Sequence, residues 1–104
     1  MRPNVPLSEH EKLLLSNYFS TKPVRRAFLF GSAARNEARK RSDIDILVEL
    51  DYSQPIGMKF FGYQLELEKL LNKKVDLVSA EGLSKHVKPF VDKDKVLIYE
   101  KGVD

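Results

Sequence analysis

Two aspartates and a Gly-Ser pair have the types and spacing needed for chemistry on a phosphate. Asp43 and Asp45 are one residue apart, and ten residues separate them from Gly31-Ser32. Because successive side chains of a strand point to opposite faces, Asp43 and Asp45 share one face if this stretch is extended. Two close carboxylates repel each other unless a cation lies between them, and Mg²⁺ takes carboxylate and phosphate oxygens as ligands. The pattern predicts a divalent-metal site.

The Gly-Ser pair follows a short apolar run and suits a phosphate-binding turn. Gly31 lets the backbone turn sharply and approach a ligand closely. Ser32 offers a hydroxyl, and the stretch from Ser32 to Arg35 can begin a short helix. Backbone N–H groups at a helix start attract anions, so we expect a phosphate here.

A third acid, Asp76, lies within the apolar run Lys74–Val78. Asp is depleted in strands, so its presence in the middle of one suggests a specific use. If this strand lies beside the one that carries Asp45, three carboxylates converge. Such a set can hold two metal ions, which activate an attacking oxygen and stabilise a leaving one.

These residues must be positioned by alternating strands and helices. Apolar runs bounded by turn residues predict strands at 24–30, 43–50, 74–79 and 95–100. Amphipathic spacing predicts helices at 8–20, 56–72 and 83–91, the last of them disturbed by Pro89. Ser8 and Glu11 form a capping-box pattern at the first helix. The fold class is therefore α/β, a small mixed sheet of about four strands packed with helices.

The helix at 56–72 has an unusually wide apolar surface. One interpretation is deep burial in a small core; the other is that part of the surface docks a second subunit or a partner protein. The apolar residues are Phe60, Phe61, Tyr63, Leu65, Leu67, Leu70 and Leu71.

Composition narrows the class of protein. The 104 residues fit one domain over 1–104, and the absence of cysteine excludes disulfides and Cys-based zinc sites. No apolar run reaches the roughly 18 residues of a membrane span, and no signal peptide is recognisable, so we expect a cytoplasmic protein without membrane contact. The formal net charge of +3 is compatible with a polyanionic ligand.

Two groups of basic residues stand out in the sequence. Arg25 and Arg26 are expected to be solvated charges at a strand end. The basic stretch 36–42 is expected to be either a solvated loop or a flap near a triphosphate.

The Gly31-Ser32 pair, the ten-residue spacing, Asp43-x-Asp45 and the third acid Asp76 together resemble the motif of the DNA polymerase beta-type nucleotidyltransferase superfamily. The short length and the runs Gly-Ser-Ala-Ala-Arg and Ser-Asp-Ile-Asp-Ile-Leu-Val resemble its minimal nucleotidyltransferase (MNT) subfamily. The resemblance covers roughly residues 24–78. One position departs from the pattern, because Asn36 stands where family members often have Gly.

The resemblance implies the nucleotidyltransferase fold and transfer of a nucleoside monophosphate, most simply AMP from ATP, to a hydroxyl. The metal ligands and catalytic residues would be Asp43, Asp45 and Asp76, with two Mg²⁺ ions. The nucleotide-binding residues would be Gly31, Ser32, Arg35 and Ser42.

The resemblance also suggests partners. MNT proteins commonly pair with HEPN-type toxins as antitoxins, some by transferring AMP to the toxin, so a HEPN-type partner protein is expected, with homo-oligomerisation left open. Three alternatives remain at this stage: a small-molecule, antibiotic-type nucleotidyltransferase, a non-catalytic binding antitoxin, and a nucleic-acid binder. The last is disfavoured because the aromatic residues fall at positions expected to be in the core.

Overall fold

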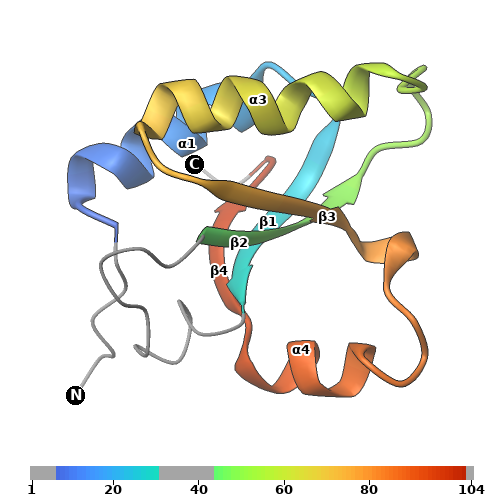
Figure 1. Ribbon diagram of the computed structural model, residues 1–104. Coiled ribbons are helices and arrows are strands. Elements are labelled where there is room, and N and C mark those ends of the chain that lie inside the picture. The colour runs from blue at the N-terminus through green and yellow to red at the C-terminus, as the bar shows by residue number, and fades with distance from the viewer. Residues whose placement is uncertain (1–6, 31–43, 103–104) are drawn as a thin grey trace.

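The computed structural model describes residues 7–30 and 44–102, and Figure 1 shows a sheet with helices on both sides. Helices α1 and α3 cover one side and α4 the other. The elements in chain order are α1 (Glu9–Ser20), β1 (Val24–Phe30), β2 (Ile44–Leu50), α3 (Lys59–Leu71), β3 (Val75–Ser79), the 3₁₀ turn η1 (Ala80–Gly82), α4 (Lys88–Asp94) and β4 (Val96–Glu100).

The described part of the chain forms a sheet of four strands in the order β3-β2-β1-β4. Strand β1 is antiparallel to both β2 and β4, and β2 is parallel to β3. A parallel pair needs a crossover connection, and α3 supplies it. The predicted mixed α/β sheet of about four strands is confirmed.

The side of the sheet under α1 and α3 holds the main core. Ile44, Ile46 and Val48 alternate along β2 and are buried there with Leu15 and Phe19 of α1. The core also takes up one stripe of α3, formed by Tyr63, Leu67 and Leu71. No helix within residues 7–30 and 44–102 is long and apolar enough to cross a membrane.

The capping box at the start of α1 is confirmed and carries a tertiary contact. The Glu11 backbone N–H donates to Ser8 Oγ, and the Ser8 N–H donates to Glu11 Oε1, both at 3.0 Å. Burial raises the pKa of Glu11, but the Ser8 N–H and the Lys73 ammonium outweigh it and leave the pKa below its usual value. The Lys73 Nζ lies 3.1 Å from Glu11 Oε2, which ties the end of α3 to the start of α1.

Two helix predictions need correction. The helix predicted at 83–91 spans Lys88–Asp94 instead, and Pro89 lies in its first turn, where a missing N–H costs nothing. The helix predicted at 56–72 begins only at Lys59. Deep burial of its whole apolar surface is also wrong, because Phe61 is 67% and Leu65 61% exposed.

The side of the sheet under α4 has a much smaller apolar cluster. Phe28 of β1 and Leu47 of β2 pack against Val91 of α4, with Phe30 and Val78 partly buried beside them. The side chains of β2 that alternate with its core residues belong to this side. Asp45, one of the predicted site residues, is among these side chains and therefore lies on the α4 side of the sheet.

Candidate active site

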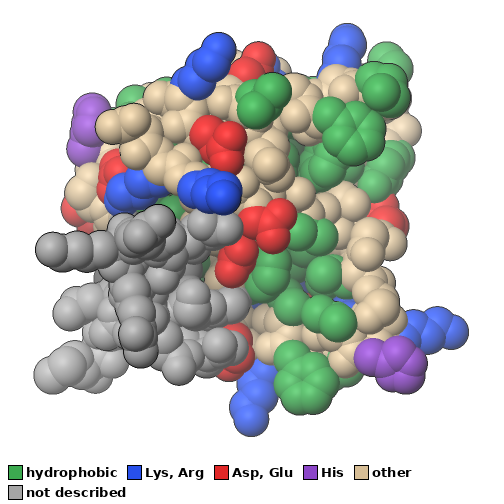
Figure 2. All heavy atoms as spheres, in the orientation of Figure 1, with side chains coloured by type: hydrophobic (Ala, Val, Ile, Leu, Met, Phe, Trp, Pro, Cys, Tyr) green, Lys and Arg blue, Asp and Glu red, His purple; other side chains and the backbone are tan. Residues whose placement is uncertain are grey.

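Two of the three predicted carboxylates lie next to each other on the α4 side of the sheet. In the parallel pairing of β2 with β3, Asp45 is the register partner of Asp76. Paired residues on neighbouring strands point to the same face, and the strands are about 4.8 Å apart. Asp45 is half-buried and Asp76 exposed. Figure 2 shows acidic side chains over these strands, facing the viewer.

The same row continues to the end of β1. Phe30, the residue before Gly31, is the antiparallel partner of Asp45. Residues 31–43 lie outside the described ranges, and with them Gly31, Ser32, Arg35, Asn36, Ser42 and Asp43. Of the two described residues that border this range, Phe30 is in the row of Asp45, and Ile44 precedes Asp45 by one residue. We call the row Phe30–Asp45–Asp76 the acidic row.

The acidic row is suited to a hard cation. Two adjacent carboxylates supply oxygen ligands and a charge that a divalent ion would neutralise. Among residues 7–30 and 44–102 there is no cluster of three His, Cys, Asp or Glu side chains with metal-binding geometry. The predicted three-acid set requires Asp43, which falls in the undescribed range.

Two residues that the sequence interpretation missed hold β3 in position. The Gln64 Oε1 accepts from the Leu77 N–H and the Glu68 Oε2 from the Val75 N–H, each at 3.0 Å. These N–H groups flank Asp76 on an edge strand, where they would otherwise lack a partner. Gln64 and Glu68 are four residues apart and therefore lie on the same face of α3. Two hydrogen-bond acceptors at this spacing, in a helix that precedes a predicted strand, were the sequence pattern that could have identified them.

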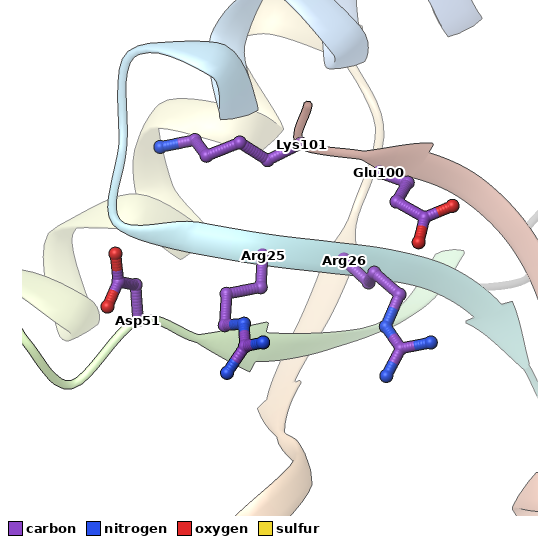
Figure 3. Close-up of a pocket in the computed structure, with 5 residues that line it drawn as sticks. All are labelled: Arg25, Arg26, Asp51, Glu100 and Lys101. Carbon is purple, nitrogen blue, oxygen red and sulfur yellow. The ribbon is translucent and has the colours of Figure 1, made fainter. Parts of the chain in front are cut away.

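The far end of β1 has a separate charged pocket. A bulge lies between Val24 and Arg26 in the pairing with β2, and Figure 3 shows Arg25 and Arg26 pointing to the same side of the strand. The pocket has a volume of about 360 Å³. It is lined by Arg25, Arg26, Asp51, Glu100 and Lys101.

Two of the charged side chains that line this pocket, Arg26 and Asp51, have partners outside the lining. Arg26 Nε lies 2.6 Å from Glu49 Oε1, an ion pair between neighbouring strands. Hydrogen bonds from the Ser53 hydroxyl and N–H lower the pKa of Asp51. Arg25 and Arg26 begin β1 and the acidic row is at its end, so this pocket is not part of the acidic row. The prediction of solvated strand-end charges holds for Arg25, whereas Arg26 is paired.

Comparison with known proteins agrees with this geometry. The family model described as polymerase beta, nucleotidyltransferase matches residues 14–103. The chain is 43% identical over 77 residues to a candidate protein adenylyltransferase of Methanocaldococcus jannaschii, covering 74% of this chain and 84% of that protein. It is 35% identical over 92 residues to the protein adenylyltransferase MntA of Thermococcus cleftensis, covering 88% of each.

Solved structures share the fold. A candidate minimal nucleotidyltransferase is similar with a TM-score of 0.70 and 31% identity, covering 84% of this chain and 87% of that one. A complex of a tri-AMPylated HEPN toxin with its MNT antitoxin, from Shewanella oneidensis, is similar with a TM-score of 0.60 and 20% identity, covering 86% of this chain and 73% of the other. At 20% identity, the likeness to the toxin-antitoxin complex shows a shared fold and no more.

Proposed function

The chain belongs to the polymerase beta nucleotidyltransferase family and is a nucleotidyltransferase, and from this we propose that it transfers AMP from ATP to a hydroxyl of a partner protein. The observation that carries the proposal is the register that makes Asp45 and Asp76 neighbours on an accessible face. Relatives with protein adenylyltransferase names support the choice of AMP and of a protein acceptor.

The proposed reaction is a displacement at the α-phosphorus of ATP. The acceptor oxygen forms a bond to that phosphorus, the bond from it to the bridging oxygen of the β-phosphate breaks, and pyrophosphate leaves. The hydroxyl proton goes to the Asp76 carboxylate. Positioning and charge neutralisation supply most of the rate in such reactions.

The predicted residues take the following roles. Asp43 and Asp45 would hold the nucleotide-associated Mg²⁺, and Asp76 would complete a second Mg²⁺ site. Bound Mg²⁺ would neutralise charge on the triphosphate and polarise its phosphorus. Gly31, Ser32, Arg35 and Ser42 would hold the phosphates through N–H, hydroxyl and guanidinium groups.

We propose that the acceptor is a HEPN-type toxin and that the chain acts as its antitoxin. The support is the structural likeness to an MNT antitoxin bound to an AMPylated HEPN toxin. Among the described residues, fewer apolar side chains cover the side of the sheet that carries the acidic row, which favours access by a macromolecular acceptor.

The test uses ATP labelled at the α-phosphate. The purified chain, Mg²⁺ and a purified HEPN-type protein are incubated, and the variants Asp45→Asn and Glu49→Gln are compared. Glu49 is the matched control, because it is a carboxylate on the same strand and the same side, outside the acidic row. We expect label on the partner with wild type and Glu49→Gln and none with Asp45→Asn.

The other results point elsewhere. Label on a small molecule from a cell extract, with none on protein, would favour the antibiotic-type nucleotidyltransferase. Toxin neutralisation that survives Asp45→Asn without any label would show a non-catalytic binding antitoxin. Either result would overturn the proposed protein adenylylation.

A further inference from the structure

Two exposed apolar patches lie on opposite sides of the sheet. One follows α3 and its N-terminal cap, where Met58, Phe61 and Leu65 are exposed. The other, which we call the α4 patch, consists of Val87, Phe90 and Leu97, exposed by 46%, 72% and 49%. Figure 2 shows hydrophobic side chains over α4 at the bottom of the face, with basic and histidine side chains near them.

The α4 patch is on the same side of the sheet as the acidic row. Leu97 of β4 is the register partner of Phe28, which packs against Leu47 and Val91 beneath α4. Phe28 precedes Phe30 of the acidic row by two residues, a distance of about 7 Å along a strand. A protein interface of ordinary size, about 800 Å² on each partner, is wide enough to cover both.

The two patches also differ in charge. The segment 83–95 around α4 carries four lysines and two aspartates, a net charge of +2. Residues 58–69 along α3 contain two lysines and two glutamates, so the net charge of that segment is zero. With Asp45 and Asp76 included, the face on the α4 side is neutral overall. The lysines therefore favour an acidic partner surface next to α4, whereas the α3 surface has no such preference.

Phe90 is held outward by contacts that fix α4. Val91, the next residue, is buried against the sheet and so takes the inward position. Asp92 lies 2.7 Å from Lys88 Nζ and 3.0 Å from Lys95 Nζ, and these two ammonium groups lower the pKa of the Asp92 carboxyl. Lys95 Nζ in turn lies 4.4 Å from the Phe28 ring centroid. An aromatic side chain presented by a fixed backbone is the kind of anchor that dominates interfaces.

We propose that the α4 patch is the docking surface for the acceptor protein, with Phe90 as its apolar anchor and Lys85 and Lys93 as its basic rim. The inference rests on the proposed function, because it assumes an acceptor that is a protein. The acceptor hydroxyl must reach the acidic row from the α4 side, since α1 and α3 cover the other side. The recognised surface would be acidic around an apolar pocket.

The test measures binding without ATP, so that it does not depend on transfer. A purified HEPN-type protein is titrated into wild type, Phe90→Asp and Phe61→Asp by calorimetry. Phe61 is the matched control, because it is an exposed Phe on the opposite side of the sheet. We expect Phe90→Asp to raise Kd by about 30-fold, the effect of losing an interface anchor, and Phe61→Asp to leave Kd unchanged.

A charge variant tests the basic rim. Lys85→Glu combined with Lys93→Glu should slow association and weaken its dependence on salt, while thermal unfolding stays as in wild type. Wild-type affinity in Phe90→Asp, or loss of affinity in Phe61→Asp, would overturn the inference and direct the partner to another surface. Loss of single-stranded RNA binding in Phe90→Asp, with protein binding intact, would also overturn it.

The two proposals fail separately. If wild type binds the partner through Phe90 but no label is transferred, the docking surface stands and the proposed transfer is wrong. If label is transferred at the wild-type kcat/KM by Phe90→Asp, the transfer stands and the docking surface is wrong. Absence of any complex with wild type would overturn the docking surface, and the labelling experiment would then decide on the transfer.

Discussion

The side of the sheet beneath α1 and α3 and the side beneath α4 are built from the same strands but differ in what covers them. Of the residues that the structure describes, fifteen buried apolar ones form the cluster on the first side and three form the cluster on the second. The first side contributes most of the hydrophobic stabilisation, which scales with the apolar area buried. The second side carries carboxylates and charged pairs in place of apolar side chains. It therefore contributes less to the free energy of unfolding, and the first side compensates for this.

Residues expected to carry chemistry and residues that carry stability alternate along β2. On β2, Ile44, Ile46 and Val48 are buried under the helices, while Asp45 and Glu49 on the opposite face are half-buried. A substitution on one side should therefore change activity, and its neighbour should change the free energy of unfolding. The predictions below test that separation.

The largest effect is expected at Asp76. Asp76→Asn removes a carboxylate from the acidic row, and loss of a charge-stabilising group in an active site typically lowers the rate by about 10²–10³-fold. The free energy of unfolding should be unchanged or slightly higher, because one of two adjacent like charges is gone. Labelled-nucleotide transfer and urea unfolding of the same preparation measure both quantities. A large drop in stability would show that Asp76 is a structural residue.

The next effect concerns the two apolar clusters. Leu67→Ala in the main core should lower the free energy of unfolding by about 3 kcal/mol, because Leu67 is fully buried. Val91→Ala removes less apolar volume and should cost about 1.5 kcal/mol. Amide hydrogen exchange should show faster exchange throughout the sheet for Leu67→Ala and only around α4 for Val91→Ala. Equal losses in both variants would mean that the two sides unfold as one unit.

Val91→Ala also connects the two proposals. If α4 presents the docking surface, loosening it should weaken partner binding while Mg²⁺-ATP binding stays at the wild-type level. An increase in the Kd for Mg²⁺-ATP would instead place α4 close to the nucleotide. Thermal unfolding at several nucleotide concentrations gives this Kd independently of the partner.

The smallest effect is expected at the α3 side chains that hold β3. Glu68→Leu removes the acceptor for the Val75 N–H, and a displaced Asp76 should lower kcat by about tenfold. Glu68→Gln keeps an acceptor oxygen and should restore most of kcat, with Lys69→Ala on the exposed side of α3 as a neutral control. Failure of Glu68→Gln to restore kcat would assign the effect to charge and not to the position of β3.

Much of the fold could be predicted from local pattern. Apolar runs ending at turn residues gave β1, β2 and β3 to within a residue, and the Ser8–Glu11 pair gave the start of α1. The last helix was misplaced, because Pro89 reads equally well as a breaker or as a first-turn residue, and only the backbone around it distinguishes the two. The exposure of Phe90 was missed because aromatic residues look like core residues in a sequence, whereas that of Phe61 matches the alternative in which part of α3 docks a partner.

The face on which Asp45 lies follows from the local sequence alone, because alternation along a strand points Asp45 away from Ile44 and Ile46 whatever the strand packs against. The position of Asp76 beside Asp45, in contrast, is set by how β2 and β3 pair in the folded chain. That register depends on the α3 crossover and on the hydrogen bonds that Gln64 and Glu68 accept from β3, and a shift of one residue would turn Asp76 to the opposite face. Pairing between distant strands is set by such long-range contacts, which no local pattern encodes.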